Sequence, residues 1–296
     1  MISKVLLLSF CLAASGFGEW LTDLKKAKNR AAEEEKDLYL VFTGSDWSQS
    51  CQRFDREVLS RKKFQEAVAS NYLLVRIDMP LRSNLPKEKK AAQRKLANRF
   101  GVETWPQAIY LDFKGRPFYR ENGVLPLSAE EYAAHILAMR AERISRDAAF
   151  EEADKLEGLA RAKAIVDILE KLPRASLLEF YPDQVSELER LDSGGSLGFL
   201  KARRSEEALA RIERSLPDLF NHRSFDALIE RVDAYLAAHQ PKGAQRQQAL
   251  SYKMAAFEYS ARPDSALELA REILAIDRKS DFGRSADRLV SKLGKE

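Results

Sequence analysis

Two residues near position 50 have the types and the placement for thiol chemistry. Cys51 follows the apolar run 38–43, which predicts a buried strand, and residues 44–46, which predict a turn and a helix cap. With a helix beginning near Trp47, Cys51 would lie in the first turn, where main-chain N–H groups and the helix dipole stabilise a thiolate. Ser48 would be in place to hydrogen-bond that thiolate.

The same residues carry a resemblance to a known family. Residues 44–51, Gly-Ser-Asp-Trp-Ser-Gln-Ser-Cys, resemble the Trp-Cys-x-x-Cys segment of thioredoxin-like proteins, with Ser48 in place of the first cysteine. Residues 101–112 resemble the family's loop with a cis-proline before a strand, and this resemblance makes Pro106 the cis residue. The two matches cover residues 20–142 and imply an α/β thioredoxin-like domain.

The chain departs from the family at the residues that perform the chemistry. In the family the first cysteine attacks a substrate disulfide and the second resolves the mixed disulfide. Ser48 cannot attack a disulfide, so we expect no two-thiol cycle from this chain alone. The family's proton-transferring carboxylate in the preceding strand is also missing, because no acidic residue lies between Asp37 and Asp46. Trp105 replaces the small or β-branched residue common before the cis-proline.

Two functions follow from the resemblance, and the sequence leaves both open. In the first, Trp47, Trp105 and Pro106 form an apolar groove for a peptide or protein partner, because the family's backbone beside the cis-proline pairs with extended segments. In the second, Cys51 alone forms mixed disulfides or reacts with peroxide, as in peroxiredoxins, which the arrangement resembles. The alternatives to both are a shielded, inert Cys51, a Trp47 that only packs its loop, and a purely structural scaffold. We expect binding rather than autonomous dithiol exchange.

The elements that must position these residues follow from hydrophobic periodicity. Helical spacing over 20–35 predicts an amphipathic helix on the sheet, with Trp20 and Leu21 on its apolar side. A crossover helix would make the first two strands parallel. Strands are predicted at 38–43, 72–78, 107–112 and 117–122, and further helices at 48–59, 61–69, 87–99 and 128–140, the last opened by a Ser128/Glu131 capping box.

The pattern beyond residue 143 is helical, so an all-α domain is expected there. Helices of about 10 to 18 residues alternate with turns near the prolines, Pro217 among them. Residues 187–198 match residues 272–283 at an offset of 85, in a pattern that resembles tetratricopeptide-type repeats. A plain helical bundle is the alternative.

The first residues predict an export signal. A short positive start, an apolar run and small residues indicate a signal peptide over 1–16, with a buried N-terminal helix as the alternative. The expected domains are then 17–142 and 143–296, in an exported protein, periplasmic or extracellular, with no later segment near the roughly 20 apolar residues that span a membrane. Cys51 would be the only cysteine of the mature chain, which excludes an intramolecular disulfide.

Charge and the remaining motifs point to no further chemistry. The net charge of +4 is spread over both halves, which does not indicate a nucleic-acid partner. His135, His222 and His239 lack metal-ligand spacing, and residues 194–198 lack the Lys-Ser or Lys-Thr of a phosphate loop, so neither a metal nor another cofactor is expected. Charged runs such as 87–90 are predicted to be solvated helix faces.

Overall fold

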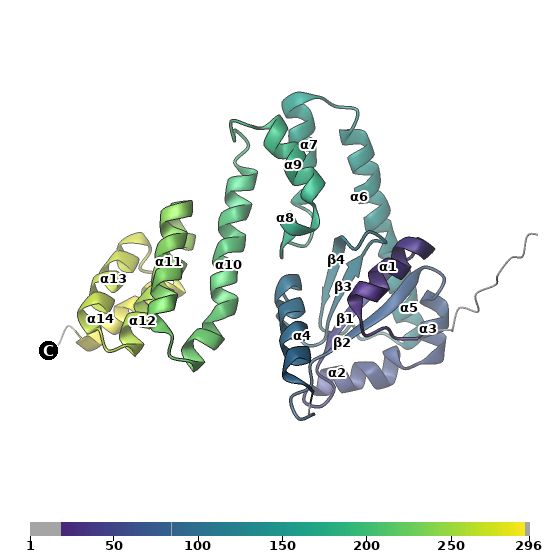
Figure 1. The fold of residues 1–296 in the computed structure, drawn as a ribbon, viewed down its shortest axis with the longest axis horizontal. Coiled ribbons are helices and arrows are strands. Elements are labelled where there is room, and N and C mark those ends of the chain that lie inside the picture. The colour runs from purple at the N-terminus through teal and green to yellow at the C-terminus, as the bar shows by residue number, and fades with distance from the viewer. Residues whose placement is uncertain (1–18, 84, 294–296) are drawn as a thin grey trace, which may run out of the picture. The chain divides into compact units, whose positions relative to one another are not determined.

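The computed structural model describes residues 19–83 and 85–293, which divide between Ala149 and Phe150 into two compact units (Figure 1). The boundary predicted at residues 142/143 falls in the same helix as this division, a few residues earlier. The signal peptide predicted at 1–16 lies outside the described residues. Among the helices that are described, none combines the length and the apolar composition needed to cross a membrane.

A four-stranded mixed sheet forms the centre of the first unit. Its spatial order is β2-β1-β3-β4, with β1 parallel to β2 and antiparallel to β3, and with β3 antiparallel to β4. The strands are β1 Asp37–Thr43, β2 Tyr72–Asp78, β3 Gln107–Leu111 and β4 Pro117–Asn122. This sheet, with its parallel first pair, confirms the predicted thioredoxin-like fold.

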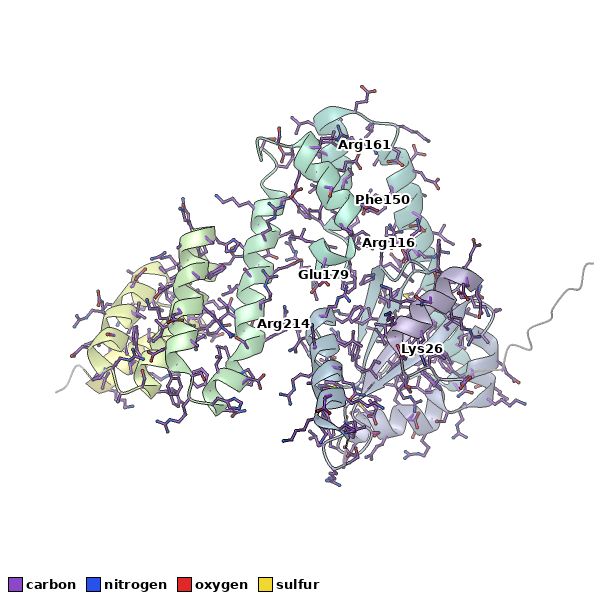
Figure 2. The ribbon with its side chains drawn as sticks, viewed as in Figure 1. Lys26, Arg116, Phe150, Arg161, Glu179 and Arg214 are labelled. Atoms are coloured by element: carbon purple, nitrogen blue, oxygen red, sulfur yellow. The ribbon has the colours of Figure 1, made fainter. Side chains whose placement is uncertain are left out.

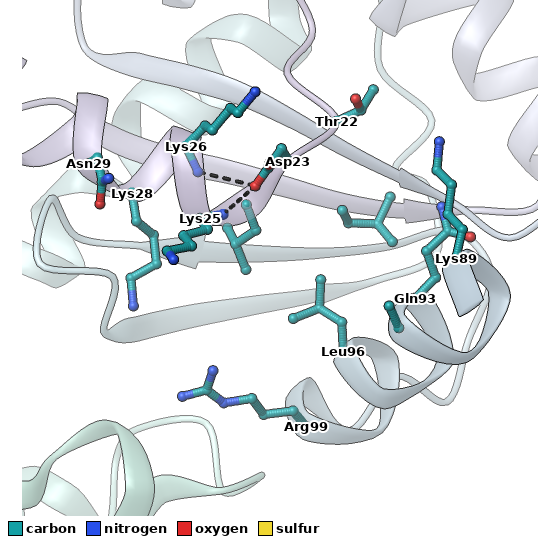
Figure 3. A pocket seen from close by; sticks show the side chains of 13 residues that line it. Thr22, Asp23, Lys25, Lys26, Lys28, Asn29, Lys89, Gln93, Leu96 and Arg99 are labelled. Atoms are coloured by element: carbon teal, nitrogen blue, oxygen red, sulfur yellow. Dashed lines mark hydrogen bonds between the residues drawn. The ribbon is translucent and has the colours of Figure 1, made fainter.

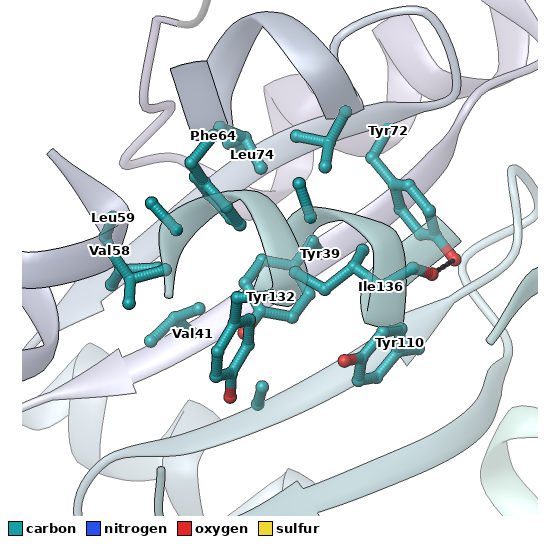
Figure 4. Packing of buried hydrophobic residues seen from close by; sticks show 14 of the residues in the cluster. Tyr39, Val41, Val58, Leu59, Phe64, Tyr72, Leu74, Tyr110, Tyr132 and Ile136 are labelled. Atoms are coloured by element: carbon teal, nitrogen blue, oxygen red, sulfur yellow. Dashed lines mark hydrogen bonds between the residues drawn. The ribbon is translucent and has the colours of Figure 1, made fainter. Parts of the chain in front are cut away.

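Helices cover both faces of the sheet. They are α1 Leu24–Glu34, α2 Gln49–Phe54, the π-helical turn η1 Asp55–Leu59, α3 Lys62–Val68, α4 Lys87–Phe100, α5 Ala129–Ala138 and α6 Arg140–Ala153. Successive side chains of β1 point to opposite faces. Tyr39 and Val41 belong to the core that includes α3 and α5 (Figure 4), whereas Phe42 contacts Phe100 of α4 with ring centroids 5.9 Å apart.

The predicted first helix is too long at its N-terminal end. Asp23 caps α1 by accepting the main-chain N–H groups of the next helical residues, so the helix cannot include Trp20 and Leu21. Leu21 instead pairs with β2, donating to the Leu74 carbonyl at 2.9 Å and accepting from the Arg76 N–H at 2.8 Å. The apolar residues that matched helical spacing therefore extend the sheet edge.

Buried ion pairs attach the N-terminal half of α6 to the sheet. Asp37, the first residue of β1, accepts from Arg140 and Arg143 at 3.2 and 3.1 Å, and burial raises the pKa of Asp37 more than these arginines lower it. Asp112, after β3, accepts from Arg146 at 2.7 Å and from Arg116 at 2.8 Å; Arg116 is labelled in Figure 2. Both carboxylates are almost fully buried, so each needs these partners.

The second unit is all-α in its described residues, as predicted. Its helices are α7 Gly158–Leu169, α8 Leu177–Phe180, α9 Pro182–Leu191, α10 Phe199–Asn221, α11 Phe225–His239, α12 Gly243–Tyr259, α13 Pro263–Ile276 and α14 Asp281–Leu293. The turn expected near Pro217 is wrong, because α10 runs through this proline and is 23 residues long.

The two sequence matches in this unit agree at helix ends and differ at their glycines. Asp192 and Asp277 each follow the last residue of a helix, α9 and α13. Gly198 precedes α10 with a φ of 67°, whereas Gly283 lies inside α14, where an added Cβ would be 2.1 Å from the Asp277 carbonyl oxygen. The internal repeat stays a prediction.

Candidate functional site

Cys51 lies where β1 passes into α2, and its thiol is buried. The side chain is 1% exposed, and its Sγ accepts the main-chain N–H of Gly44 at 3.3 Å. Gly44 is needed in this turn, because a Cβ there would lie 2.3 Å from the indole ring of Trp47. The turn therefore closes tightly over the sulfur, as expected for the shielded second cysteine of the motif.

Ser48 is the N-cap of α2. Its hydroxyl accepts the main-chain N–H of Cys51 at 3.4 Å, which is the usual role of a serine at this position. The helix thus begins at Gln49, within two residues of the predicted start near Trp47. The hydroxyl contacts the backbone of Cys51, so the hydrogen bond from Ser48 to a thiolate stays a prediction.

Trp47, Trp105 and Pro106 lie together beside this helix start. The two indole rings pack edge to face with centroids 5.6 Å apart, and the Trp105–Pro106 peptide bond is cis. Trp47 is 36% exposed and donates from its Nε1 to the Met79 carbonyl at 2.9 Å, while Trp105 is partly buried and Pro106 is buried. Two aromatic rings and a proline from distant segments thus form one apolar lip.

Hydrogen bonds hold the backbone on both sides of Trp105 and Pro106 in place, but they do not involve the main-chain groups of Trp105. The Oε1 of Gln107 accepts the N–H groups of Glu103 and Thr104 at 2.9 and 3.3 Å, and the Pro106 carbonyl accepts the Gly123 N–H at 2.9 Å. The main-chain groups of Trp105 make no hydrogen bond with any residue that the structure describes. A rigid segment with free backbone groups is what an added strand requires.

Asp46, predicted only as part of a turn and helix cap, has a further role in the site. Its carboxylate accepts the N–H groups of Leu81, Arg82 and Ser83 at 2.9, 2.7 and 3.1 Å. Slight burial opposes ionisation, but these three donors together hold the pKa of Asp46 below its usual range. Asp46 therefore fixes the loop after β2 against the turn that carries Trp47.

A buried carboxylate under α5 was also missed. Glu121 of β4 is 6% exposed and accepts from the hydroxyls of Tyr110, at 3.3 Å, and Tyr132, and it contacts His135 Nε2 at 2.6 Å. Burial and the neighbouring Glu121 raise the pKa of both tyrosines. The ring of Tyr132 lies 4.9 Å from that of Phe54 in α2, so this network supports the helix that carries Cys51.

The three histidines are separate in space as well as in sequence. His135 contacts Glu121, His222 contacts the Asp218 carbonyl at 2.8 Å, and the ring of His239 packs on Tyr235. Within residues 19–83 and 85–293, no three His, Cys, Asp or Glu side chains are grouped as metal ligands.

Comparison with known proteins identifies the first unit. Residues 24–140 match the family model described as a thioredoxin-like domain. Among curated proteins, the disulfide bond reductase DsbH of Chlamydia pneumoniae is 24% identical over 95 residues, which cover 32% of this chain and 57% of DsbH. The thioredoxin-related protein DsbJ of the same organism is 28% identical over 103 residues, which cover 34% of this chain and 29% of DsbJ.

These matches are partial. The chain spans 57% and 29% of the length of the two curated relatives. A solved structure described as a DsbH oxidoreductase is 21% identical, with a TM-score of 0.39, and the match covers 46% of this chain and 93% of that one.

Proposed function

Since residues 24–140 form a thioredoxin-like domain, we propose that the chain is a binding module of this family, which holds an extended segment of a partner protein in the Trp47/Trp105/Pro106 groove. The observation that carries this proposal is the pairing of an apolar lip, formed by Trp47, Trp105 and the cis residue Pro106, with an incomplete thiol motif. Ser48 occupies the position of the attacking cysteine, and Cys51 is 1% exposed. Binding needs only the groove, whereas disulfide exchange needs an accessible thiolate.

The groove is suited to strand addition. The main-chain groups of Trp105 have no hydrogen-bond partner among the described residues, and the two indole rings would cover an apolar side chain of the bound segment. Main-chain hydrogen bonds would give affinity, and contacts with the indoles would give selectivity. Large aromatic side chains at the centre of such a surface commonly contribute most of the binding energy.

A second function, thiol chemistry at Cys51, is favoured by the name of one relative, a disulfide bond reductase. With a single thiol, a chain of this kind would form a mixed disulfide with a substrate disulfide and would release one substrate thiolate. A second thiol, from a partner or a small molecule, would then have to release the product.

Export and a role for the helical unit belong to the same proposal. The pattern of residues 1–16 supports export, which would place the chain where unfolded or oxidised proteins occur. The helical unit would offer the partner a second surface.

Mass spectrometry of the chain recovered from an export-competent host should show the loss of about 16 residues; a full-length chain would contradict export.

The groove is tested with an unfolded, cationic probe, ribonuclease A that has been reduced and alkylated with iodoacetamide. Calorimetry of the full chain should detect binding, and Trp105→Ala should weaken it at least tenfold, because a central aromatic contact is lost. Tyr259→Ala is the matched control: Tyr259 is 62% exposed in the second unit, and its loss should leave the affinity within twofold. Equal affinities for all three proteins, or no binding, would refute the groove.

Thiol labelling separates the two functions. In a Cys11→Ser background, Cys51 should react with a maleimide or with oxidised glutathione slowly in the native protein and rapidly only after denaturant is added, because its sulfur is buried. Reaction of the native protein at neutral pH, abolished by Cys51→Ala together with a disulfide reductase activity, would make the second function correct.

A further inference from the structure

A pocket of about 900 Å³ lies between α1 and α4, on the face of the sheet where Phe42 of β1 packs against Phe100 of α4. Figure 3 shows Lys25 and Lys28 extending from α1 on one side of it and Lys89, Leu96 and Arg99 from α4 on the other. All of its lining residues belong to the first unit. None of them is Cys51, Trp47, Trp105 or Pro106.

The pocket is lined by five cationic side chains, Lys25, Lys26, Lys28, Lys89 and Arg99, and α4, which forms one side of it, is strongly positive as a whole. In its 14 residues α4 has six cationic side chains and one glutamate, a net charge of +5, against +4 for the whole chain. The rest of the chain therefore carries a net charge of −1. The even spread expected from the sequence is wrong, because the first unit, residues 1–149, carries a net charge of +6 and the second a net charge of −2.

Several of these cations have no carboxylate to neutralise them. Lys25, Lys87, Lys89 and Lys95 are exposed and make no ion pair with any described residue. The single acidic side chain in the lining, Asp23, accepts the N–H groups of Lys25 and Lys26 as the cap of α1. A concave site lined by one sign of charge raises the local concentration of oppositely charged ligands.

The floor of the pocket is apolar. Leu24, Ile77, Ala92 and Leu96 line it, and Ile77 is only 3% exposed. A small apolar ligand group could contact this floor while its anionic groups face the lysines. The volume is within the range of 300–1,000 Å³ that is typical of ligand pockets, and roughly suits a few residues of a peptide.

We propose that the α1/α4 pocket binds an acidic peptide segment with apolar side chains, carried by a partner protein. A membrane surface suits the pocket less well, because Ile77 is buried and Leu24 and Leu96 are partly buried, so these side chains are not free to enter a bilayer. The large hydrophobic side chains that are exposed in the described residues, such as Leu81 and Ile144, are not part of the lining. This site is independent of the proposed groove and of Cys51.

The experiment is calorimetry of the full chain with three blocked hexapeptides: alternating Glu-Leu, alternating Glu-Gly and alternating Lys-Leu. At an ionic strength of about 0.01 M, where charges interact over roughly 30 Å, only the Glu-Leu peptide should bind well. Binding should weaken with salt. Amide shifts in the ¹⁵N-labelled chain should map to α1 and α4.

Two charge-reversed variants locate the site. Lys25→Glu with Lys89→Glu should weaken binding by about tenfold or more, since two attractions become repulsions. The control, Lys171→Glu with Lys242→Glu, reverses two exposed lysines of the second unit and should change the affinity less than twofold. Equal effects of the two variants would overturn the proposal.

Three further outcomes would also overturn it: no binding at low salt, equal binding of the Glu-Gly peptide, or binding to phosphatidylglycerol vesicles without binding to any peptide. The cationic ribonuclease probe used for the groove has the wrong charge for this pocket. A failure of one site is therefore distinguishable from a failure of the other.

Discussion

Ser48 and Cys51 show how a single atom, oxygen in place of sulfur, decides what this helix start is able to do. The hydroxyl of Ser48 accepts the N–H of Cys51, as a cap should, so the fold keeps this position without a sulfur. A hydroxyl at this site is not a nucleophile toward disulfides, because its pKa is far above that of a thiol. The attacking thiol is therefore missing from a helix start that is otherwise formed.

Replacing Ser48 with cysteine should supply the missing nucleophile. We expect Ser48→Cys to gain disulfide reductase activity, measured as dithiothreitol-driven reduction of insulin, and to lose about 1 kcal/mol of stability with the cap. Ser50→Cys adds a thiol to the same helical turn at an exposed position and should gain no such activity. An inactive but folded Ser48→Cys protein would mean that other parts of the machinery are also missing.

His135 should contribute to stability through Glu121. Removing its ring by His135→Ala leaves a 6% exposed carboxylate without that partner, and losing a hydrogen bond to a buried charged group costs about 2 kcal/mol. His222→Ala is the matched control, because His222 is exposed and should change the unfolding free energy by less than about 0.5 kcal/mol. Urea unfolding measures the unfolding free energy of each variant. Equal unfolding free energies for His135→Ala and His222→Ala would contradict a structural role for the contact between His135 and Glu121.

At the scale of elements, the loop after β2 depends on a single charge on the turn after β1. Asp46 holds three consecutive N–H groups of that loop, and Trp47 donates to its Met79 carbonyl. The position of the apolar lip therefore depends on contacts between two segments that are more than 30 residues apart in the sequence.

Acid should release this loop before the domain unfolds. The folded pKa of Asp46 is depressed, so its contribution is complete above the unfolded value of about 3.9 and is lost as the pH falls through the folded pKa. The amide ¹H shifts of Leu81, Arg82 and Ser83 should therefore titrate together with a midpoint below about 3.9. In Asp46→Asn they should not titrate, and a midpoint above 4 in the parent protein would contradict the depressed pKa.

The strands could be predicted because the apolar runs at 38–43 and 72–78 are short and rich in aromatic and aliphatic residues, which favours a buried strand over a helix. Periodicity failed at Leu21, whose spacing fits a helix but whose backbone pairs with β2. Pairs such as Glu121 with His135, on a strand and a helix 14 positions apart, leave no pattern in a single sequence. The thiol and the cis-proline were found because each lies in a motif of contiguous residues.

For the whole molecule, the chain has two units, each with its own apolar core. All three tryptophans, at positions 20, 47 and 105, are in the first unit, whereas helices make up the second. Tryptophan fluorescence therefore reports on the first unit alone, and far-ultraviolet circular dichroism includes both.

Gly283→Ala should destabilise the second unit selectively. Alanine usually stabilises a helix relative to glycine by about 1 kcal/mol, but here its Cβ would meet the Asp277 carbonyl oxygen at 2.1 Å, so a net loss of about 2 kcal/mol is expected. The dichroism transition in urea should move to lower concentration while the fluorescence transition stays in place. Gly194→Ala, in open space, should move neither. Parallel shifts of both signals would mean that the units unfold together.

The enclosure of Cys51 has a practical consequence. In a Cys11→Ser background its sulfur is the chain's only thiol, and a reagent reaches it only when the turn between β1 and α2 comes apart. The rate of modification, compared with the rate for the unfolded chain, therefore measures how often the turn opens. It gives the free energy of that local opening. Any molecule that binds to the neighbouring indoles should lower the rate of Cys51 modification. The buried thiol can therefore be used to detect binding without knowing the ligand in advance.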